Sequence, residues 1–400
     1  MQLRSVMWLV VVVGCTGPAR THTGRARPGI DVLLSDSVHL VAGRRVGLLT
    51  NQTGVDADGV DDVFRLMAAG VPLTLFNPEH GRRGVLDQEN IEHGVDSATR
   101  IIVYSLYGTV REPTAEMLAN VDVMVVDLQD IGARTFTFVS TALRTLRAAT
   151  AHGVPVVVLD RPNPVGGELV QGPVLDMAFA SFVGMLPVPL RHGMTFGELM
   201  RFGNDVLGIH GDLAVIPVTG WPRSAWFDQT GLPWVRPSPN MPSLESATHY
   251  PGIVLFEATN LSVGRGTPIA FQVIGAPWLD AGAVARALGP QPHVSVRDTV
   301  ITPVEPPDGK YGARTIPAIR LLVTDRHTYD PVALAVRLLY TVRQIHPGSI
   351  VIRARDFDRR AGSDGLRLAL EAGVRPDSII RSWDSGLMAF RTLRRRYLLY

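Results

Sequence analysis

Residues 121–128, VDVMVVDL, are apolar at almost every position. Shorter segments of the same kind occur at residues 46–49, 72–76, 101–104 and 155–159. A strand whose two faces are both covered has this continuous apolar composition, whereas a strand with one face in water alternates apolar and polar residues. The five segments therefore predict strands of a buried parallel sheet.

Helical patterns alternate with these strands. They lie at residues 60–69, 114–120, 137–152 and 195–207. In the last of them Thr195 is a suitable N-cap and Glu198 occupies the capping-box position. Because strands that alternate with helices build a parallel sheet covered on both faces, we expect a Rossmann-like α/β domain.

The alternation loosens after Asp160, and residues 221–251 are rich in proline and predicted to be mostly loop. Farther along, strands are expected at residues 270–274 and 318–323, and helices at 281–288, 331–345 and 379–392. We therefore predict an α/β chain whose Rossmann-like parallel sheet domain covers residues 29–245. A smaller α+β domain is expected to follow over residues 246–400.

The N-terminus has the pattern of an export signal. A short basic start precedes a continuous apolar run at residues 8–13, which is far too short to span a bilayer. Residues 12–15, VVGC, resemble a lipobox, in which the cysteine is acylated after cleavage. We expect a lipoprotein signal peptide over residues 1–15 with lipidation at Cys15. The alternative is a plain secretory signal in which this cysteine stands by chance.

The segment after the signal, residues 16–28, is rich in Thr, Gly, Arg and Pro and is expected to be a flexible tether. Such a chain would be an exported lipoprotein of the cell envelope, on the periplasmic or extracellular face of a membrane. It would contact the membrane through the lipid anchor only. Cys15 is the only cysteine, so no disulfide can form within the chain.

Charge and motifs narrow the class of partner. The formal net charge of the 400 residues is only +2, and the basic cluster at residues 394–396 is expected to be a solvated helix face, so no nucleic acid partner is expected. No G-x-G-x-x-G follows the first strand, and no phosphate-binding P-loop motif occurs. We expect no cofactor and no metal, and the oligomeric state stays open.

Polar residues follow each predicted strand, where ligands bind in open α/β sheets. Residues 50–54, TNQTG, follow the first strand, and residues 77–81, NPEHG, follow the second. Residues 127–134, DLQDIGAR, and 160–164, DRPNP, follow the next two apolar segments. A structural loop would not need Glu79-His80, nor Asp160-Arg161 directly after an apolar strand. We therefore expect one functional rim suited to acid/base work on a hydroxyl-rich ligand.

Candidate residues fall into two groups. The candidates for catalysis are Glu79, His80, Asp127, Asp130 and Asp160. The candidates for substrate binding, which include residues of three later polar loops, are Asn51, Gln129, Arg134, Arg161, Asn163, Arg191, His192, Asn240, Glu257, Asn260 and Arg265.

Taken in order, these motifs resemble a known family. The segments at residues 47–54, 78–81, 127–134, 159–164, 191–195, 237–242 and 259–267 are similar to those of the NamZ-type exo-β-N-acetylmuramidases, glycoside hydrolase family 171. The resemblance runs from about residue 29 to residue 400. One departure is visible at residues 135–138, TFTF, where family members often have tyrosine.

The resemblance implies two domains with an active-site cleft between them. It also implies an exo-acting glycosidase that releases N-acetylmuramic acid from the non-reducing end of peptidoglycan-derived muropeptides or disaccharides, with Glu79 as a catalytic residue. Glu79 is our choice for the general acid, and Asp127, Asp130 and Asp160 remain open as second carboxylates. A bidentate arginine among Arg134, Arg161, Arg191 and Arg265 would suit the lactyl carboxylate of muramic acid.

Two other functions fit the same residues. Glu79, His80, Asp127 and His192 could build the site of a metal-dependent peptidoglycan deacetylase or esterase, although no H-E-x-x-H or H-x-x-E-H spacing supports it. A non-catalytic, muropeptide-binding envelope lipoprotein would also have a polar rim. It would release no free sugar, so a product assay separates it from an enzyme.

Overall fold

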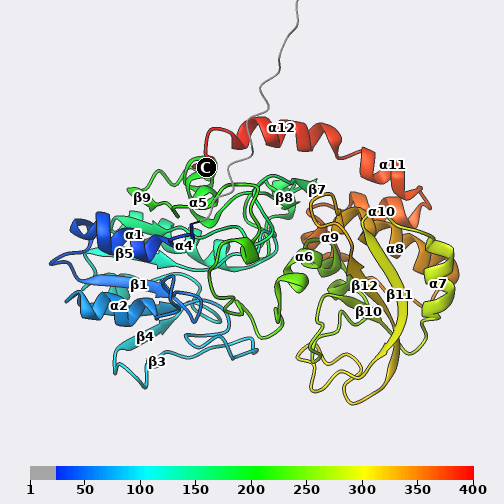
Figure 1. Ribbon diagram of the computed structural model, residues 1–400, viewed down its shortest axis with the longest axis horizontal. Helices are drawn as coiled ribbons and strands as arrows, with labels where there is room; N and C mark the ends of the chain where they lie inside the picture. Colours follow the sequence, from blue (N-terminus) through cyan, green and yellow to red (C-terminus); the bar gives the residue numbers. More distant parts are fainter. Residues whose placement is uncertain (1–23) are drawn as a thin grey trace, which may run out of the picture.

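The structure is a computed structural model, and it describes residues 24–400. The predicted signal peptide, the lipidated Cys15 and most of the predicted tether lie outside the described residues. Figure 1 shows two domains side by side. No helix in the described part of the chain is long and apolar enough to cross a membrane.

The first domain contains a seven-stranded sheet in the order β3-β4-β2-β1-β5-β6-β9. Its strands are β1 (Val46–Thr50), β2 (Leu73–Asn77), β3 (Gly94–Val95), β4 (Ile102–Ser105), β5 (Val123–Asp127), β6 (Val156–Leu159) and β9 (Leu213–Ile216). All neighbours pair in parallel except the short edge strand β3, which is antiparallel to β4. The five predicted strands are confirmed.

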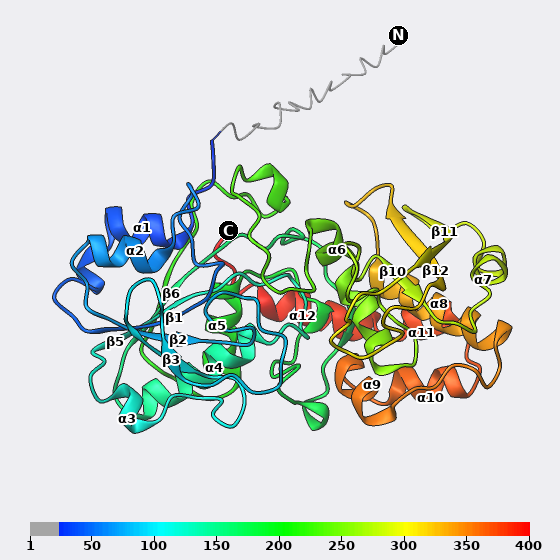
Figure 2. The same ribbon diagram turned by 90° about the horizontal axis from the view of Figure 1, so that it is seen from below.

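Both faces of the sheet are buried, as the continuous apolar strands predicted. The helices of this domain are α1 (Gly29–Asp36), α2 (Asp62–Ala68), α3 (Ala115–Leu118), α4 (Phe138–Ala151) and α5 (Phe196–Val206). Val123 and Val125 of β5 pack in the cluster that contains residues of α1 and α2. Met124 and Val126 pack in the cluster that contains residues of α4 and α5. Figure 2 shows α1 and α2 on one side of the strands and α4 on the other.

The second domain has a three-stranded antiparallel sheet in the order β10-β12-β11. Its elements are β10 (Val273–Gly275), β11 (Val294–Ile301), β12 (Ile316–Val323), α6 (Leu244–Ile253), α7 (Ala281–Leu288), α8 (Pro331–Ile345), α9 (Ala354–Ala361) and α10 (Gly365–Glu371). Helices α7 and α8 have the bounds predicted for them. The α+β fold class is confirmed.

Helix α6 lies in the segment predicted to be mostly loop, so that prediction was wrong for its end. The helix contains Pro251 and is buried from Ser246 to Ile253, so it has no polar face and no amphipathic pattern to reveal it. Gly252 lets α6 approach α8, because a Cβ there would lie 1.9 Å from the carbonyl oxygen of Pro331.

Short elements complete the fold. They are β7 (Gln171–Val174), which pairs with β8 (Pro189–Arg191), and the 3₁₀ turns η1 (Val38–Leu40), η2 (Met177–Phe179), η3 (Phe227–Gln229) and η4 (Val254–Ala258). The chain ends with α11 (Pro376–Arg381) and α12 (Asp384–Arg394).

Helix α12 leaves the second domain and returns across the molecule to the first (Figure 1). At its end Nη1 of Arg394 donates to the carbonyl oxygens of Gly167 at 3.1 Å and Gly193 at 2.7 Å. The expectation that residues 394–396 form a solvated face is wrong for Arg394, which is 8% exposed and whose pKa is lowered to about 10 by burial. The chain therefore ties its last helix to the first domain.

Candidate active site

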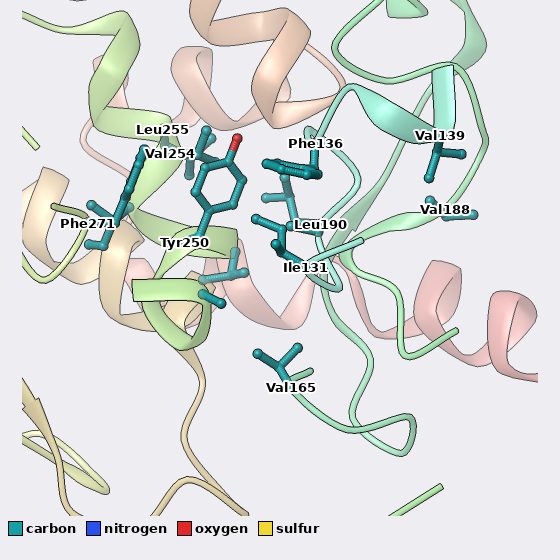
Figure 3. Close-up of a cluster of buried hydrophobic side chains, with 14 of the residues drawn as sticks. Ile131, Phe136, Val139, Val165, Val188, Leu190, Tyr250, Val254, Leu255 and Phe271 are labelled. Atoms are coloured by element: carbon teal, nitrogen blue, oxygen red, sulfur yellow. The ribbon is translucent and has the colours of Figure 1, made fainter. Parts of the chain in front are cut away.

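A cavity of about 560 Å³ lies between the two domains. Its lining is Glu79, His80, Glu89, Tyr107, Arg111, Thr135, Phe136, Thr137, Ser181, Phe182, Val183, Ser238, Asn240, Met241, Tyr250, Val254, Glu257, Arg265, Phe271, Asp356, Arg359 and Arg360. Figure 3 shows Phe136 of the first domain facing Tyr250 of the second, and Phe271 lies on the opposite side of the Tyr250 ring. These rings are edge-on neighbours, with centroids 6.2 Å apart for Phe136 and Tyr250 and 4.7 Å for Tyr250 and Phe271. One wall of the cavity is thus largely aromatic, and charged side chains line the rest of the cavity.

Glu79 is held by two hydroxyl groups in the loop that follows β2. The hydroxyl of Tyr107 donates to its Oε1 at 2.7 Å, and the hydroxyl of Thr137 donates to its Oε2. Burial and the charge of Glu79 raise the pKa of Tyr107, so the phenol stays a donor. The carboxylate is therefore fixed in direction at the edge of the cavity while it remains half-buried.

His80 follows Glu79 in a left-handed backbone conformation, with φ of 71°. Its Nδ1 lies 2.8 Å from the carbonyl oxygen of Leu86. Because a carbonyl only accepts, Nδ1 carries a proton, and in the neutral ring Nε2 is an acceptor. His80 is 6% exposed and can offer this acceptor to a hydroxyl group in the cavity.

The second domain contributes a buried ion-pair group centred on Glu257. Nε of Arg265 donates to its Oε1 at 2.8 Å, and Nε of Arg360 lies 3.5 Å from its Oε2. Burial alone would raise the pKa of Glu257, but the two guanidinium groups outweigh it, so the pKa lies below its ordinary value. Asp87 lies 3.8 Å from Arg265 and accepts a hydrogen bond from the side chain of Asn240.

Two cations of the cavity have no carboxylate within ion-pair distance in residues 24–400. Arg111 donates to the carbonyl oxygen of Gly108 at 3.2 Å, and its guanidinium lies 4.8 Å from the ring centre of Phe182. Arg359 comes from the end of α9. Arg111 and Arg359 can therefore bind an anionic group of a ligand, whereas Arg265 and Arg360 already face Glu257.

Five of the predicted site residues line this cavity: Glu79, His80, Asn240, Glu257 and Arg265. The other strand ends do not reach it, so the expectation of one shared rim needs correction. Asp127, at the end of β5, is fully buried and paired with Arg161, whose Nη2 donates to its Oδ2 at 2.8 Å. The ion pair therefore occupies this part of the sheet edge, where we had expected a ligand to bind.

Asp160, at the end of β6, is covered as well. Its carboxylate accepts hydrogen bonds from the backbone of Gly197 at 2.8 Å and from the hydroxyls of Thr195 and Tyr400 at 2.6 and 2.7 Å. Burial raises the pKa of Asp160 to about 6. The last residue of the chain therefore lies over the strand end where a ligand had been expected.

The remaining candidates near the first domain are buried in structural contacts. Asp130 accepts from the backbone of Gly132 at 2.6 Å and lies 3.3 Å from His192. Nη1 of Arg134 donates to two carbonyl oxygens at 2.8 Å, those of Pro173 and Val188, and Nη2 donates to that of Arg360 at 2.8 Å. These groups hold loops together and lie outside the cavity lining.

The same correction applies to five further residues, none of which lines the cavity. Arg191 donates to Gln171 at 3.1 Å, and Asn51 accepts from the backbone of Thr53 at 2.9 Å. The side-chain amides of Gln129, Asn163 and Asn260 donate to the carbonyl oxygens of Pro162, Met194 and Ser349 at 2.9, 2.8 and 2.8 Å.

Several lining residues were not among the sequence candidates, namely Tyr107, Arg111, Thr137, Phe182, Arg359 and Arg360. None stands in a motif that marks it, and α9 was not predicted as a helix. The clue for Thr137 was its place in the segment where the sequence departs from the family pattern. In residues 24–400, no three His, Cys, Asp or Glu side chains gather in a way that could hold a metal ion.

Comparison with known proteins finds matches over most of the described chain. The family model described as exo-β-N-acetylmuramidase NamZ, N-terminal, matches residues 46–245, and its C-terminal counterpart matches residues 248–400. A peptidoglycan β-N-acetylmuramidase NamZ of Bacillus subtilis is 39% identical over 382 residues, which cover 94% of this chain and 92% of that protein.

Two solved structures have the same fold. Both are DUF1343 family proteins of Bacteroides fragilis, and both matches cover 94% of this chain and 99% of the other. One gives a TM-score of 0.87 at 33% identity, and the other gives 0.76 at 28% identity.

Proposed function

This chain belongs to the NamZ family of exo-β-N-acetylmuramidases, and we propose that it cleaves terminal N-acetylmuramic acid from peptidoglycan fragments with Glu79 as the general acid. The family match confirms the resemblance found in the sequence. The chain is a glycoside hydrolase that acts in peptidoglycan turnover. The observation that carries the assignment of Glu79 is its position, held by two hydroxyls at the edge of the interdomain cavity.

Glycoside cleavage needs a proton for the leaving oxygen and stabilisation of an oxocarbenium-like centre. Glu79 can supply the proton. The hydroxyl of Tyr107 can donate to Oε1 in both states, because the carbonyl oxygen of a carboxylic acid also accepts, and the proton on Oε2 stays free for the leaving oxygen. The same contact therefore orients Glu79 in both protonation states. Nε2 of His80 is placed to accept a hydrogen bond from a sugar hydroxyl or from water.

Recognition of the sugar divides between the aromatic wall and the cations. Phe136, Tyr250 and Phe271 offer apolar surface to the pyranose ring. The lactyl carboxylate that distinguishes muramic acid from glucosamine pairs, in our proposal, with Arg111 and Arg359. Arg134, Arg161 and Arg191, our candidates from sequence, are bound to buried groups and do not line the cavity.

The test of the acid is the variant Glu79→Gln, assayed on a chromogenic N-acetylmuramic acid glycoside. We expect turnover to fall by about 10²–10⁴-fold, the usual effect of losing a general acid. The matched control is Glu112→Gln, since Glu112 is an exposed carboxylate of a neighbouring loop and does not line the cavity. Near-normal turnover of Glu79→Gln would remove Glu79 from this role.

We also propose that the protein is exported and anchored by lipid on Cys15. The support is the order of a basic start, a short apolar run and the sequence VVGC at residues 12–15. A lipid anchor on Cys15 would leave the enzyme domain at the cell envelope, close to its peptidoglycan substrate. Expression of Cys15→Ser in a bacterial host should move the protein from the membrane fraction to the soluble fraction. Unchanged fractionation would contradict the proposal.

A further inference from the structure

The phenol hydroxyl of Tyr250 is a polar group of the catalytic cavity that the proposed mechanism leaves unused. Tyr250 lies on the buried helix α6, lines the cavity and is 8% exposed. Figure 3 shows its oxygen pointing away from the α6 backbone. The hydroxyl has no hydrogen bond of normal geometry in residues 24–400, and it is not among the polar atoms that are buried away from water. It is therefore open to a ligand in the cavity.

A second hydroxyl lies beside this phenol. Thr135 also lines the cavity and is 4% exposed. Its hydroxyl stabilises the ionised form of Tyr250 and is therefore close to it, although the two groups do not form a hydrogen bond of normal geometry. Thr135 Oγ1 has no other partner in the described residues. Because a buried polar group without a partner costs free energy, this pair of hydroxyls is incomplete without a ligand.

The phenol can only complete the pair as a donor to the ligand. Burial and the charge of Glu257 raise the pKa of Tyr250, so the phenol keeps its proton. When that proton is donated to a ligand, the phenol oxygen can accept a hydrogen bond from the hydroxyl of Thr135. The matching ligand group is therefore an acceptor, such as a carbonyl oxygen.

The surroundings of this donor suit a neutral group with an apolar end. The Tyr250 ring is an edge-on neighbour of Phe136 and Phe271, and Val254 lines the cavity four residues further along the chain. Arg265, the cation nearest to Phe271, already faces Glu257. An anion such as the lactyl carboxylate therefore has no free cation here. A methyl group next to a carbonyl oxygen fits both the apolar rings and the single donor.

We propose that the hydroxyl of Tyr250 donates a hydrogen bond to the carbonyl oxygen of the 2-acetamido group of N-acetylmuramic acid, whose methyl group packs against Phe136 and Phe271. The inference rests on the proposed function, because that function supplies the sugar. Tyr250 is a substrate-binding residue that selects sugars with an acetamido group. Thr135 is a positioning residue, since it acts on the substrate through the phenol of Tyr250.

The experiment measures the binding of two sugars by isothermal titration calorimetry. One is N-acetylmuramic acid, and the other is its 2-hydroxy analogue, 3-O-(1-carboxyethyl)glucose, which keeps the lactyl group and lacks the acetamido group. Tyr250→Phe should raise Kd for N-acetylmuramic acid about tenfold, the effect of losing one hydrogen bond, and leave Kd for the analogue unchanged. Tyr340→Phe is the control, because this phenol of α8 does not line the cavity.

The role of Thr135 is tested by Thr135→Val, which keeps the shape of the side chain and removes the hydroxyl. We expect a smaller rise in Kd, again for N-acetylmuramic acid only. Because Thr135 acts through the phenol, Thr135→Val should add no further loss in a protein that already carries Tyr250→Phe. Fully additive losses would contradict the positioning role.

Two results would overturn the assignment of Tyr250. An equal rise in Kd for both sugars would mean that the phenol maintains the shape of the cavity, and an unchanged Kd for both would mean that it does not bind the sugar. Failure of the proposed function gives a different result, because the wild type would then neither bind N-acetylmuramic acid nor turn over its chromogenic glycoside. If the wild type does both and Tyr250→Phe binds N-acetylmuramic acid equally well, this inference alone is wrong.

Discussion

The hydroxyl of Tyr107 donates a 2.7 Å hydrogen bond to Oε1 of Glu79, although 28 positions of sequence separate them. Tyr107 follows β4 and Glu79 follows β2, and the two strands are parallel neighbours in the sheet. The pairing of strands therefore brings together an acid and the group that orients it. Phe182 packs near the same phenol, with ring centres 6.1 Å apart, and limits its movement.

Removing this phenol hydroxyl should weaken catalysis more than binding. In Tyr107→Phe the carboxylate loses one of its two hydroxyl partners and gains freedom to turn, so we expect kcat to fall about 10- to 100-fold while KM changes little. Steady-state kinetics on a chromogenic muramic acid glycoside measures the split. Tyr104→Phe is the control, because the Tyr104 ring packs against Phe76 and its hydroxyl has no part in the site. A kcat equal to wild type would show that Thr137 alone orients Glu79.

Arg134 should hold α9 in position against the first domain. It is 6% exposed, burial lowers its pKa to about 9, and its Nη2 donates to the carbonyl oxygen of Arg360 in α9. Arg134→Lys cannot reach three carbonyl oxygens with one ammonium group, and we expect it to lose about 3 kcal/mol of unfolding free energy. Because α9 carries Arg359 into the cavity, KM should rise as well.

Urea denaturation and steady-state kinetics measure the two effects of Arg134→Lys. Arg147→Lys, at an exposed position of α4, is the matched control and should change neither. A lowered stability with an unchanged KM would mean that α9 keeps its place without this contact.

The buried Asp160 should make stability depend on pH. Its pKa is raised from an ordinary value near 3.8 to about 6, so the native state holds the proton more tightly than the unfolded chain does. The resulting stability is present below about pH 4 and is lost as pH rises through 6, by about 3 kcal/mol in total. Asp160→Asn has no such proton. The unfolding free energy of the wild type relative to the variant should therefore fall by most of that amount from pH 4 to pH 7, and a constant difference would contradict the raised pKa.

The sequence sufficed for five of the seven strands of the first domain's sheet, but only for part of the site. Strands such as β5 are apolar on both faces, so their composition alone reveals them. Helix α6 is buried on every side and lacks the period that would reveal it. Asp127, Asp160 and Glu79 are all acids near strand ends, and local sequence cannot distinguish them.

What separates those three acids is contact over long distances along the chain. Arg161 neutralises Asp127, and Tyr400 covers Asp160 from 240 positions away. The cavity lies where α9 and the loop of Phe182 meet the end of β2, and no motif links those segments. Candidates from motifs therefore included Glu79 and Arg265 but left out Tyr107 and Arg359.

Arg111 should determine preference for muramic acid. Its guanidinium lies over Phe182 and has no carboxylate partner in residues 24–400, so it can form a charge-assisted contact with the lactyl group. In Arg111→Met we expect kcat/KM for the muramic acid glycoside to fall about 10- to 100-fold, the range for losing one hydrogen bond to a charged group. The matching N-acetylglucosamine glycoside lacks the lactyl group, so its slow turnover should not change. Arg286→Met, on the exposed side of α7, is the control. An equal loss of activity on both substrates would mean that Arg111 maintains the structure of the cavity. Another cation, of which Arg359 is the next candidate, would then bind the lactyl carboxylate.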